Sequence, residues 1–315
     1  MESSGKKKTS NENIVDRIST LPDEILQHIL SFLETSTAAK SSVLSKRWRH
    51  LWVRAPALDF NLDRVSMSRI HRASLRRKSS TLRRLRLQID DPTIVSSSGA
   101  IDQLLNELVD FSMPSQIQEL QLVFHHTYKL PRYVLSSGNL RTLELGHCDI
   151  RYVGAMNLAR VETLSLSGVN AASAKAIVLL ISSCVSVKKF RYVSCHKVRK
   201  LDLCFRELRE LVLESPGKLR NLNIDAPKLQ SVELKFDGDD FELSLKNVLN
   251  LQRAVLGHGL HYCCYTNCIP QFKKVLGIAK VLELSFDPAR VPLVLLFPYL
   301  LYIIYRLLLT YSICA

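Results

Sequence analysis

The sequence predicts an α+β repeat protein, in which a small N-terminal unit of three short helices precedes a solenoid with a curved sheet and few irregular helices. Three observations predict this fold class. Residues 15–60 carry three short apolar patterns of helical period, and the following chain repeats a leucine motif with the period of a strand. The spacing between copies of that motif also shortens toward the C-terminus, which sets the shape of each coil.

Pro22 lies in the first turn of the first predicted helix, where the missing N–H of proline costs little. Thr20 precedes Asp23 by three residues, as in a capping box. Two apolar stripes lie side by side along the helix, one formed by Leu21, Ile25, Ile29 and Phe32 and the other by Leu26, Leu30 and Leu33. So wide an apolar surface can contact two partners at once.

Two further short helices are predicted after the first. Thr35 or Ser36 can cap the second, and Ser45 can cap the third, in which Trp48 and Trp52 lie one turn apart. About forty residues are too few to bury this much apolar surface. From the residues alone, the unit either packs against the rest of the chain or covers its surface with a partner.

Two ordered runs in this unit resemble the F-box of plant F-box/leucine-rich-repeat proteins. They read Leu-Pro-Asp-Glu-Ile-Leu-x-x-Ile-Leu-Ser-Phe-Leu from Leu21 and Ser-Val-Leu-Ser-Lys-Arg-Trp-Arg-x-Leu-Trp from Ser42, without a gap. The resemblance implies docking on the Skp-type linker of a cullin–RING (SCF-type) ubiquitin ligase. The linker-contacting positions that it implies are Leu21, Pro22, Ile25, Leu26, Ile29, Leu30, Leu33, Val43, Leu44 and Trp48. Spacing alone does not decide which of them face the linker and which pack inward.

The chain after this unit repeats the pattern L-x-x-L-x-L, with other apolar residues allowed. The L-x-L part has the period-two signature of a strand with one buried face, and such strands bury their leucines by stacking. The copies are Leu82/Leu85/Leu87, Ile117/Leu120/Leu122, Leu140/Leu143/Leu145, Val161/Leu164/Leu166, Val187/Phe190/Tyr192, Val198/Leu201/Leu203, Leu208/Leu211/Leu213, Leu219/Leu222/Ile224, Leu229/Val232/Leu234, Leu251/Ala254/Leu256 and Ala279/Leu282/Leu284.

The step between copies is irregular. From Leu120 to Leu164 it is 21 to 23 residues, within the range of leucine-rich repeats. From Leu201 to Val232 it falls to ten or eleven, which leaves no room for a helix. We therefore expect extended segments on both the front and the back of these coils, with turns at 214–219 and 225–229. Helices are expected at 100–111 and 171–182.

This order of segments also resembles the family, with the F-box first and leucine-rich repeats after it. In relatives the repeats recruit the substrate through outward residues inside L-x-L, so an unidentified protein substrate is expected here. Those positions include Glu144, Ser165, Arg191, Asp202, Val212, Asn223 and Glu233. They share no chemistry that identifies a ligand, and a role in solubilising the sheet stays open.

Composition indicates a folded protein from a reducing compartment. Hydrophobic content of 47% and charged content of 23% are typical of globular chains. The eight cysteines form no CxxC pair, and no signal segment or N-glycosylation sequon is present, so cytoplasm or nucleus is expected. Cys148 and Cys195, each three residues after a strand position, are expected to be small buried residues.

The formal net charge of +14 raises the question of nucleic-acid binding. Much of the excess lies in one basic segment, which includes Arg72, Arg76, Arg77, Lys78, Arg83, Arg84 and Arg86. No nucleic-acid-binding motif and no interleaved aromatic residues accompany it. The pattern favours a solvated linker over a nucleic-acid site.

No catalytic motif is present among the phosphate-binding loops, zinc-hydrolase helices and nucleophile elbows. We expect a non-catalytic adaptor without a cofactor, which acts by holding a substrate near an enzyme on another subunit. His258, His261, Cys263, Cys264 and Cys268 are zinc-type ligands, but their spacing fits no standard site, and we interpret them as a repeat loop without metal.

Residues 291–315 are apolar, carry one charge and are long enough to span a bilayer. Pro298 would interrupt a helix there, and Arg306 would place a charge inside the apolar stretch. We favour a truncated or alternative end over a membrane tail anchor.

The expected domains are a disordered basic N-terminus (1–14), the F-box (15–60), a basic linker (61–80), leucine-rich repeats (81–290) and the apolar tail (291–315). The rival to a ligase adaptor is a leucine-rich-repeat scaffold for protein interactions, with no ligase role, anchored to a membrane by that tail.

Overall fold

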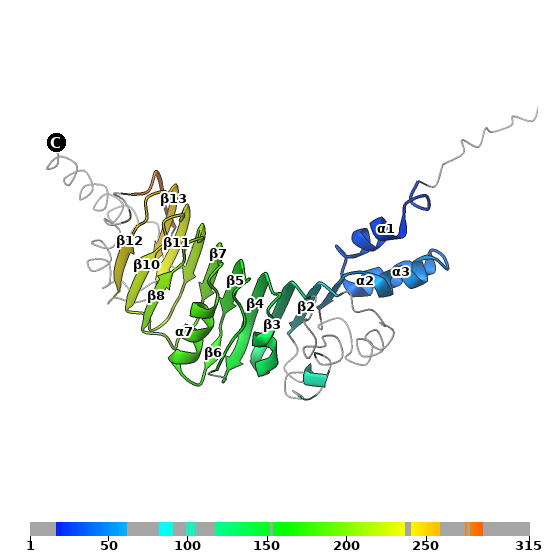
Figure 1. Cartoon of the computed structure of the whole chain (residues 1–315), viewed down its shortest axis with the longest axis horizontal. Helices are drawn as coiled ribbons and strands as arrows, with labels where there is room; N and C mark the ends of the chain where they lie inside the picture. The colour runs from blue at the N-terminus through cyan, green and yellow to red at the C-terminus, as the bar shows by residue number, and fades with distance from the viewer. Residues whose placement is uncertain are drawn as a thin grey trace, which may run out of the picture.

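The computed structural model describes residues 17–61, 82–90, 99, 101–103, 105, 117–151, 154–236, 241–258, 275 and 278–285. Within them, a helical unit at the N-terminal end is followed by a curved array of parallel strands (Figure 1). The predicted α+β class, a three-helix unit followed by a solenoid, is confirmed.

The helical unit consists of α1 (Asp23–Leu30), α2 (Thr35–Lys40), the short 3-10 helix η1 (Ser41–Val43) and α3 (Trp48–Arg54). The predicted caps of the first two helices are wrong. Thr20 Oγ1 donates to the carbonyl of Arg17, and α1 and α2 begin after Pro22 and Glu34 without a side-chain cap. At α3, Ser45 Oγ accepts a hydrogen bond of 3.5 Å from the Trp48 N–H.

The main sheet is parallel, and most of its neighbouring strands follow one another along the chain. Its order is β1-β2-β3-β4-β5-β7-β9-β11-β13-β14, and the short β6 pairs with β4. The strands are β1 (Ala57–Asn61), β2 (Arg84–Ile89), β3 (Glu119–Lys129), β4 (Thr142–Ile150), β5 (Thr163–Ser167), β6 (Asn170–Ala171), β7 (Lys189–Val193), β9 (Glu210–Glu214), β11 (Ser231–Phe236), β13 (Arg253–His258) and β14 (Val281–Ser285).

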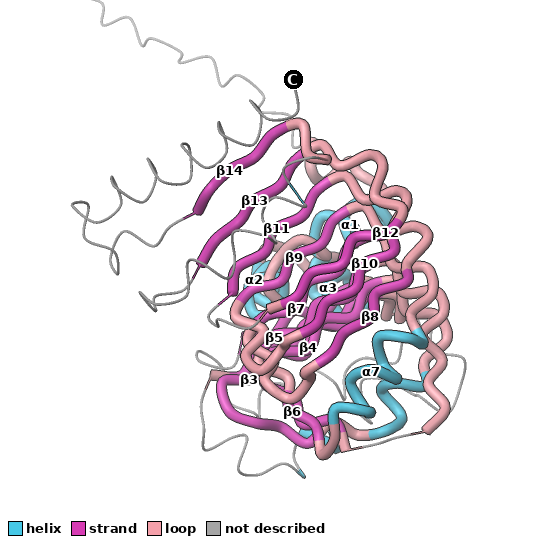
Figure 2. The backbone as a smooth tube through the Cα atoms, turned by 90° about the vertical axis from the view of Figure 1, so that its left-hand side faces the viewer, coloured by secondary structure: helices cyan, strands magenta, loops and turns pink. Residues whose placement is uncertain are grey.

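A second sheet forms where the repeat step shortens. Strands β8 (Lys200–Cys204), β10 (Asn221–Asp225) and β12 (Glu242–Lys246) pair in parallel in the order β12-β10-β8. Each of them alternates along the chain with a strand of the main sheet, so one coil contributes a strand to each sheet (Figure 2). The prediction of extended segments on the front and the back is confirmed.

Helices replace the second sheet where the step is longer. Helix α7 (Ala174–Ser183) lies in the predicted 171–182 segment and begins later because Asn170 and Ala171 pair with β4. The 3-10 helix η2 (Arg132–Ser136) follows β3. Of the helix expected at 100–111, the described residues 99, 101–103 and 105 are helical, and the rest lies outside the described residues.

The solenoid buries the leucine positions that the motif predicts. Register aligns Leu120, Leu143 and Leu164 across three strands, and all three side chains are fully buried. The same holds in the second sheet for Leu201, Leu222 and Leu243. Cys148 and Cys195 are buried as expected, in a core that is separate from that of the helical unit.

Besides the two-residue β6, two strands of the structure do not match any predicted strand. Strand β1 lies almost wholly within the segment assigned to the F-box, but it pairs with β2 as the first strand of the main sheet. Strand β12 follows a Gly-Asp-Asp sequence and continues the second sheet, although no copy of the motif was read there.

Candidate functional site

The helical unit has a small apolar core. It consists of Leu26, Leu30, Ala38, Leu51, Trp52 and Ala55, with Leu21, Ala39, Trp48 and Val53 packed against it. Helix α1 contributes Leu26 and Leu30, one turn apart, and α3 contributes Leu51 and Trp52. This core is too small to use all of the apolar side chains that the unit carries.

The remaining apolar side chains of the unit stay in solvent. We call them the exposed apolar set: Ile18, Ile25, Ile29, Phe32, Leu33, Val43 and Leu44. They make up seven of the eleven large exposed hydrophobic residues in the described part of the chain. Their concentration in about forty residues makes this unit a candidate binding surface.

Helix α1 separates the two apolar stripes. Ile25 and Ile29 are exposed by 46% and 43%, and Phe32, one turn further on, is exposed by 68%. Leu26 and Leu30, on the other stripe, are buried. Within its bounds, α1 therefore uses Leu26 and Leu30 for its own core and presents Ile25 and Ile29 outward. Beyond its ends the predicted stripes do not hold, because Leu21 packs against the core and Leu33 is exposed.

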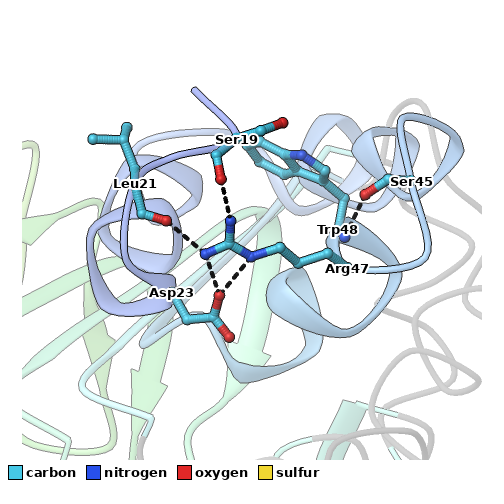
Figure 3. A network of polar contacts seen from close by, with 6 residues as sticks. All are labelled: Ser19, Leu21, Asp23, Ser45, Arg47 and Trp48. Carbon is cyan, nitrogen blue, oxygen red and sulfur yellow. Dashed lines mark hydrogen bonds and ion pairs between the residues drawn. The ribbon is translucent and has the colours of Figure 1, made fainter. Parts of the chain in front are cut away.

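Arg47 holds the start of α1 against α3 (Figure 3). Its Nε donates to Asp23 Oδ1 at 2.7 Å, and its two terminal nitrogens donate to the carbonyls of Ser19 at 2.8 Å and Leu21 at 2.6 Å. An Arg Nη–Asp Oδ1 ion pair of 2.5 Å adds to this network. Such charge-assisted bonds fix the backbone on which Leu21 and Pro22 lie. Sequence reasoning missed this role of Arg47, because its partners lie 24 to 28 residues away.

Two side-chain hydrogen bonds join the helical unit to the first two strands of the sheet, and an ion pair links those strands to each other. The Asp59 N–H of β1 donates to Thr35 Oγ1 at 2.8 Å, and an Arg84 Nη of β2 donates to the carbonyl of Ser31. Arg86 forms an ion pair of 3.6 Å with Asp59. Burial raises the pKa of the Asp59 carboxyl above its ordinary value, and Arg86 opposes that change. The joint thus consists of polar contacts to the first two strands.

Comparison with known proteins agrees with this architecture. Residues 75–284 match the family described as At1g61320/AtMIF1, LRR domain, and residues 18–56 match the F-box domain. The chain belongs to the F-box/leucine-rich-repeat family.

Relatives in Arabidopsis thaliana carry both names. F-box/LRR-repeat protein 25 is 29% identical over 230 residues, which is 70% of this chain and 86% of that protein. The putative F-box/FBD/LRR-repeat protein At4g03220 is 30% identical over 70% of this chain and 47% of its own length. F-box/LRR-repeat protein At3g03360 is 28% identical over 76% of this chain and 51% of its own length. The chain thus spans about half the length of most of these relatives.

The predicted linker-contacting residues of the F-box divide into three groups. Leu26 and Leu30 lie in the core, and Leu21 and Trp48 are half-buried against it. The exposed group is Pro22, Ile25, Ile29, Leu33, Val43 and Leu44. Ile18 and Phe32 share this exposure but were not among the predicted contacts, although Phe32 has the same helical spacing as Ile25 and Ile29.

The outward positions of the repeats do not form one face, which corrects the prediction. Glu144, Ser165, Arg191, Val212 and Glu233 lie in one registered row across the main sheet. Asp202 and Asn223 lie instead on the second sheet, where Asn223 Nδ2 donates to Asp202 Oδ1 at 2.5 Å.

Other sequence-predicted features lie partly or wholly outside the described residues. These are most of the basic linker, the residues His261, Cys263, Cys264 and Cys268, and the apolar tail 291–315. In the part of the chain that the structure describes, no group of three metal-ligating side chains comes together. The described helices also include none with the length and apolar character to cross a membrane.

Proposed function

We propose that this chain is a substrate adaptor of an SCF-type ubiquitin ligase, in which the exposed apolar set of the F-box docks on a Skp-type linker. The observation that carries the proposal is the exposure of Ile25 and Ile29 on α1, with Phe32 just after it, while Leu26 and Leu30 of the same helix fill the core. Membership of the F-box family supports the choice of partner.

The physical argument concerns apolar area. A large aliphatic side chain that leaves water gains about 1.5–3 kcal/mol, so burying several members of the exposed set would stabilise a complex substantially. Binding energy of this kind is concentrated in a few central residues. Ile25 and Ile29, adjacent along one helix face and beside Phe32, are the expected centre.

The leucine-rich repeats would recruit the protein to be modified. The adaptor then contributes proximity: it holds a lysine of the recruited protein near a conjugating enzyme on another subunit. This role needs no catalytic side chain in the adaptor, in keeping with F-box/leucine-rich-repeat proteins in general.

A pull-down of the full chain with a purified Skp-type linker tests the docking step. We expect Ile25→Asp/Ile29→Asp to lose about 2 kcal/mol or more of binding free energy, because two carboxylates would enter an apolar interface. Val185→Asp is the matched control, since Val185 is 62% exposed and lies in the solenoid after α7. Circular dichroism and melting curves check that all variants are folded.

Equal binding by the wild type and the Ile25/Ile29 variant would overturn the proposed docking surface. A folded wild type that does not bind the linker at all would leave a leucine-rich-repeat scaffold without a ligase role.

A further inference from the structure

Four exposed cations on the solenoid have no charge partner among the described residues, unlike several cations of the main sheet. Within the main sheet, Lys189 pairs with Glu210 at 2.8 Å and Arg191 with Glu214 at 3.7 Å. Lys235 and Arg253 each pair with a glutamate at 2.7 Å. The strands from β7 to β14 of that sheet therefore carry a balanced pattern of charge within the described residues.

The start of the second sheet is different. Two successive coils carry the same three-residue pattern, Lys197-Val198-Arg199 and Lys218-Leu219-Arg220. Val198 and Leu219 are buried, whereas the four flanking cations are exposed. We call Lys197, Arg199, Lys218 and Arg220 the basic quartet. None of the four side chains has a hydrogen bond or ion pair with a described residue.

Backbone hydrogen bonds place the two coils side by side. The Arg220 N–H donates to the Arg199 carbonyl at 2.8 Å, and β8 pairs with β10 from the next residue on. Neighbouring strands lie about 4.8 Å apart, and residues two apart along an extended chain lie about 7 Å apart. The quartet therefore forms a compact array in which like charges face each other, an arrangement that destabilises a sheet.

Two described carboxylates of the second sheet, Asp202 and Glu242, already have other partners. Asp202 forms an ion pair of 3.3 Å with Lys200 and accepts a hydrogen bond from Asn223. Glu242 accepts a hydrogen bond of 2.7 Å from Asn221 Nδ2. Within the described residues, the four side chains of the quartet are therefore exposed and have no carboxylate partner.

We propose that the basic quartet binds an acidic segment of a protein held by the solenoid. This inference rests on the proposed recruiting function and specifies the chemistry of what is recruited. Two arginines on adjacent coils suit carboxylate or phosphate oxygens, because a guanidinium donates two parallel hydrogen bonds to such groups. The two lysines, one position set back on each coil, add positive charge beside them.

A protein segment fits this site better than nucleic acid. Single-stranded nucleic acids need aromatic side chains for stacking and a cationic groove that follows several phosphates. The aromatic residues of the adjoining coils, Phe190, Tyr192 and Phe205, are buried. An array of about 5 by 7 Å matches one or two acidic side chains.

Fluorescence anisotropy of labelled octaglutamate with the full chain tests the inference. Arg199→Gln/Arg220→Gln is expected to weaken binding at least tenfold at low salt. The control Lys175→Gln/Lys246→Gln removes the same net charge from exposed positions on α7 and β12 and is expected to change binding less than twofold. An equal loss in both double variants would overturn the proposal, because only net charge would then matter.

Two further probes identify the source of the negative charge. A phosphoserine peptide that binds more tightly than octaglutamate, with the same dependence on Arg199 and Arg220, supports the site with phosphate as its ligand. Single-stranded DNA that binds more tightly than either peptide and loses affinity in the same variant would overturn a protein ligand.

Two more measurements distinguish a failure of the quartet proposal from a failure of the proposed docking on the linker. Removing the facing charge in Arg220→Gln is expected to leave the Tm unchanged or to raise it at low salt, and the difference should shrink as salt increases. Linker binding by Arg199→Gln/Arg220→Gln should equal that of the wild type. If that variant binds both linker and octaglutamate normally, the quartet proposal fails while the docking proposal stands.

Discussion

The F-box and the solenoid handle apolar surface in opposite ways. In the solenoid each strand covers its neighbour, so the leucines of successive coils are fully buried and the outward rows carry polar and charged residues. In the F-box, no described residue covers Ile25, Ile29 and Phe32, which stay exposed. An apolar side chain is thus structural where the fold supplies its cover, and becomes a binding residue where it does not.

The largest expected effect comes from the solenoid core. Phe190→Ala removes a buried ring that lies 6.0 Å, centroid to centroid, from that of Phe205, and should lower the free energy of unfolding by about 3–5 kcal/mol. Chemical denaturation measures this change. Val185→Ala, at an exposed site, is the control and should stay within about 0.5 kcal/mol of wild type.

The corresponding change in the F-box is Leu26→Ala. Leu26 is fully buried, so a cost of about 2–4 kcal/mol is expected, but it should fall on the separate core of the helical unit. Hydrogen exchange should show faster exchange of the α1 and α3 amides and unchanged protection in β4, β5 and β7. Uniform loss of protection along the solenoid would show that the two cores unfold together and would break the comparison.

Arg47→Ala should destabilise the F-box by about 1–3 kcal/mol, because the backbone carbonyls of Ser19 and Leu21 and the carboxylate of Asp23 lose their donor. Arg47→Lys should recover only part of this, since a single ammonium does not reproduce the planar guanidinium. Thermal melting with hydrogen exchange of α1 follows both variants. A lysine variant as stable as wild type would argue against the planar network.

The joint between the two regions is tested by Thr35→Val. The valine keeps the shape of a buried side chain but removes the acceptor of the Asp59 N–H, and a cost of about 1–2 kcal/mol is expected. Thr35→Ser retains the hydroxyl and should cost less. Melting curves of the two variants separate the effect of losing the hydroxyl from that of losing the methyl group. Equal Tm values would show that this hydrogen bond does not stabilise the joint.

The smallest expected effect is the pH dependence of Asp59. Burial raises the pKa of its carboxyl above the ordinary value of 3.8, although Arg86 lowers it in part. The folded state therefore holds this proton more tightly, and the associated stability is present below pH 3.8 and lost as pH rises through the raised pKa. Compared with Asp59→Asn, the wild type should lose stability between acidic and neutral pH. A parallel pH profile for the two proteins would contradict the assignment.

The sequence was most informative where contacts are periodic. The buried partners of Leu143 or Leu222 occupy the same place in the next coil, so spacing alone predicted strands, stacking and the second sheet. It was least informative where a contact joins distant residues. Thr35 was predicted to cap a helix, yet its hydroxyl accepts from Asp59, and Asp23 is engaged by Arg47.

The candidate site shows the same division. Helical period identified both apolar stripes of α1 but did not assign them, because Ile25 and Leu26 are equally apolar and only the position of α3 makes one of them internal. The outward residues Asp202 and Asn223 were placed on the wrong sheet for a related reason. Two strand motifs ten residues apart look alike in sequence, whether they face forward or backward.

The polar joint at Thr35, Ser31 and Asp59 is where any tilt between the F-box and the solenoid would pivot. Ten strands in a row, spaced by about 4.8 Å, place β14 roughly 40 Å from β1 along the sheet. A tilt of about 10° at the pivot would displace the far end by roughly 7 Å, more than the length of a lysine side chain. In the proposed adaptor, weakening these two hydrogen bonds would thus change the position of a recruited protein, even if both proposed binding surfaces stayed intact.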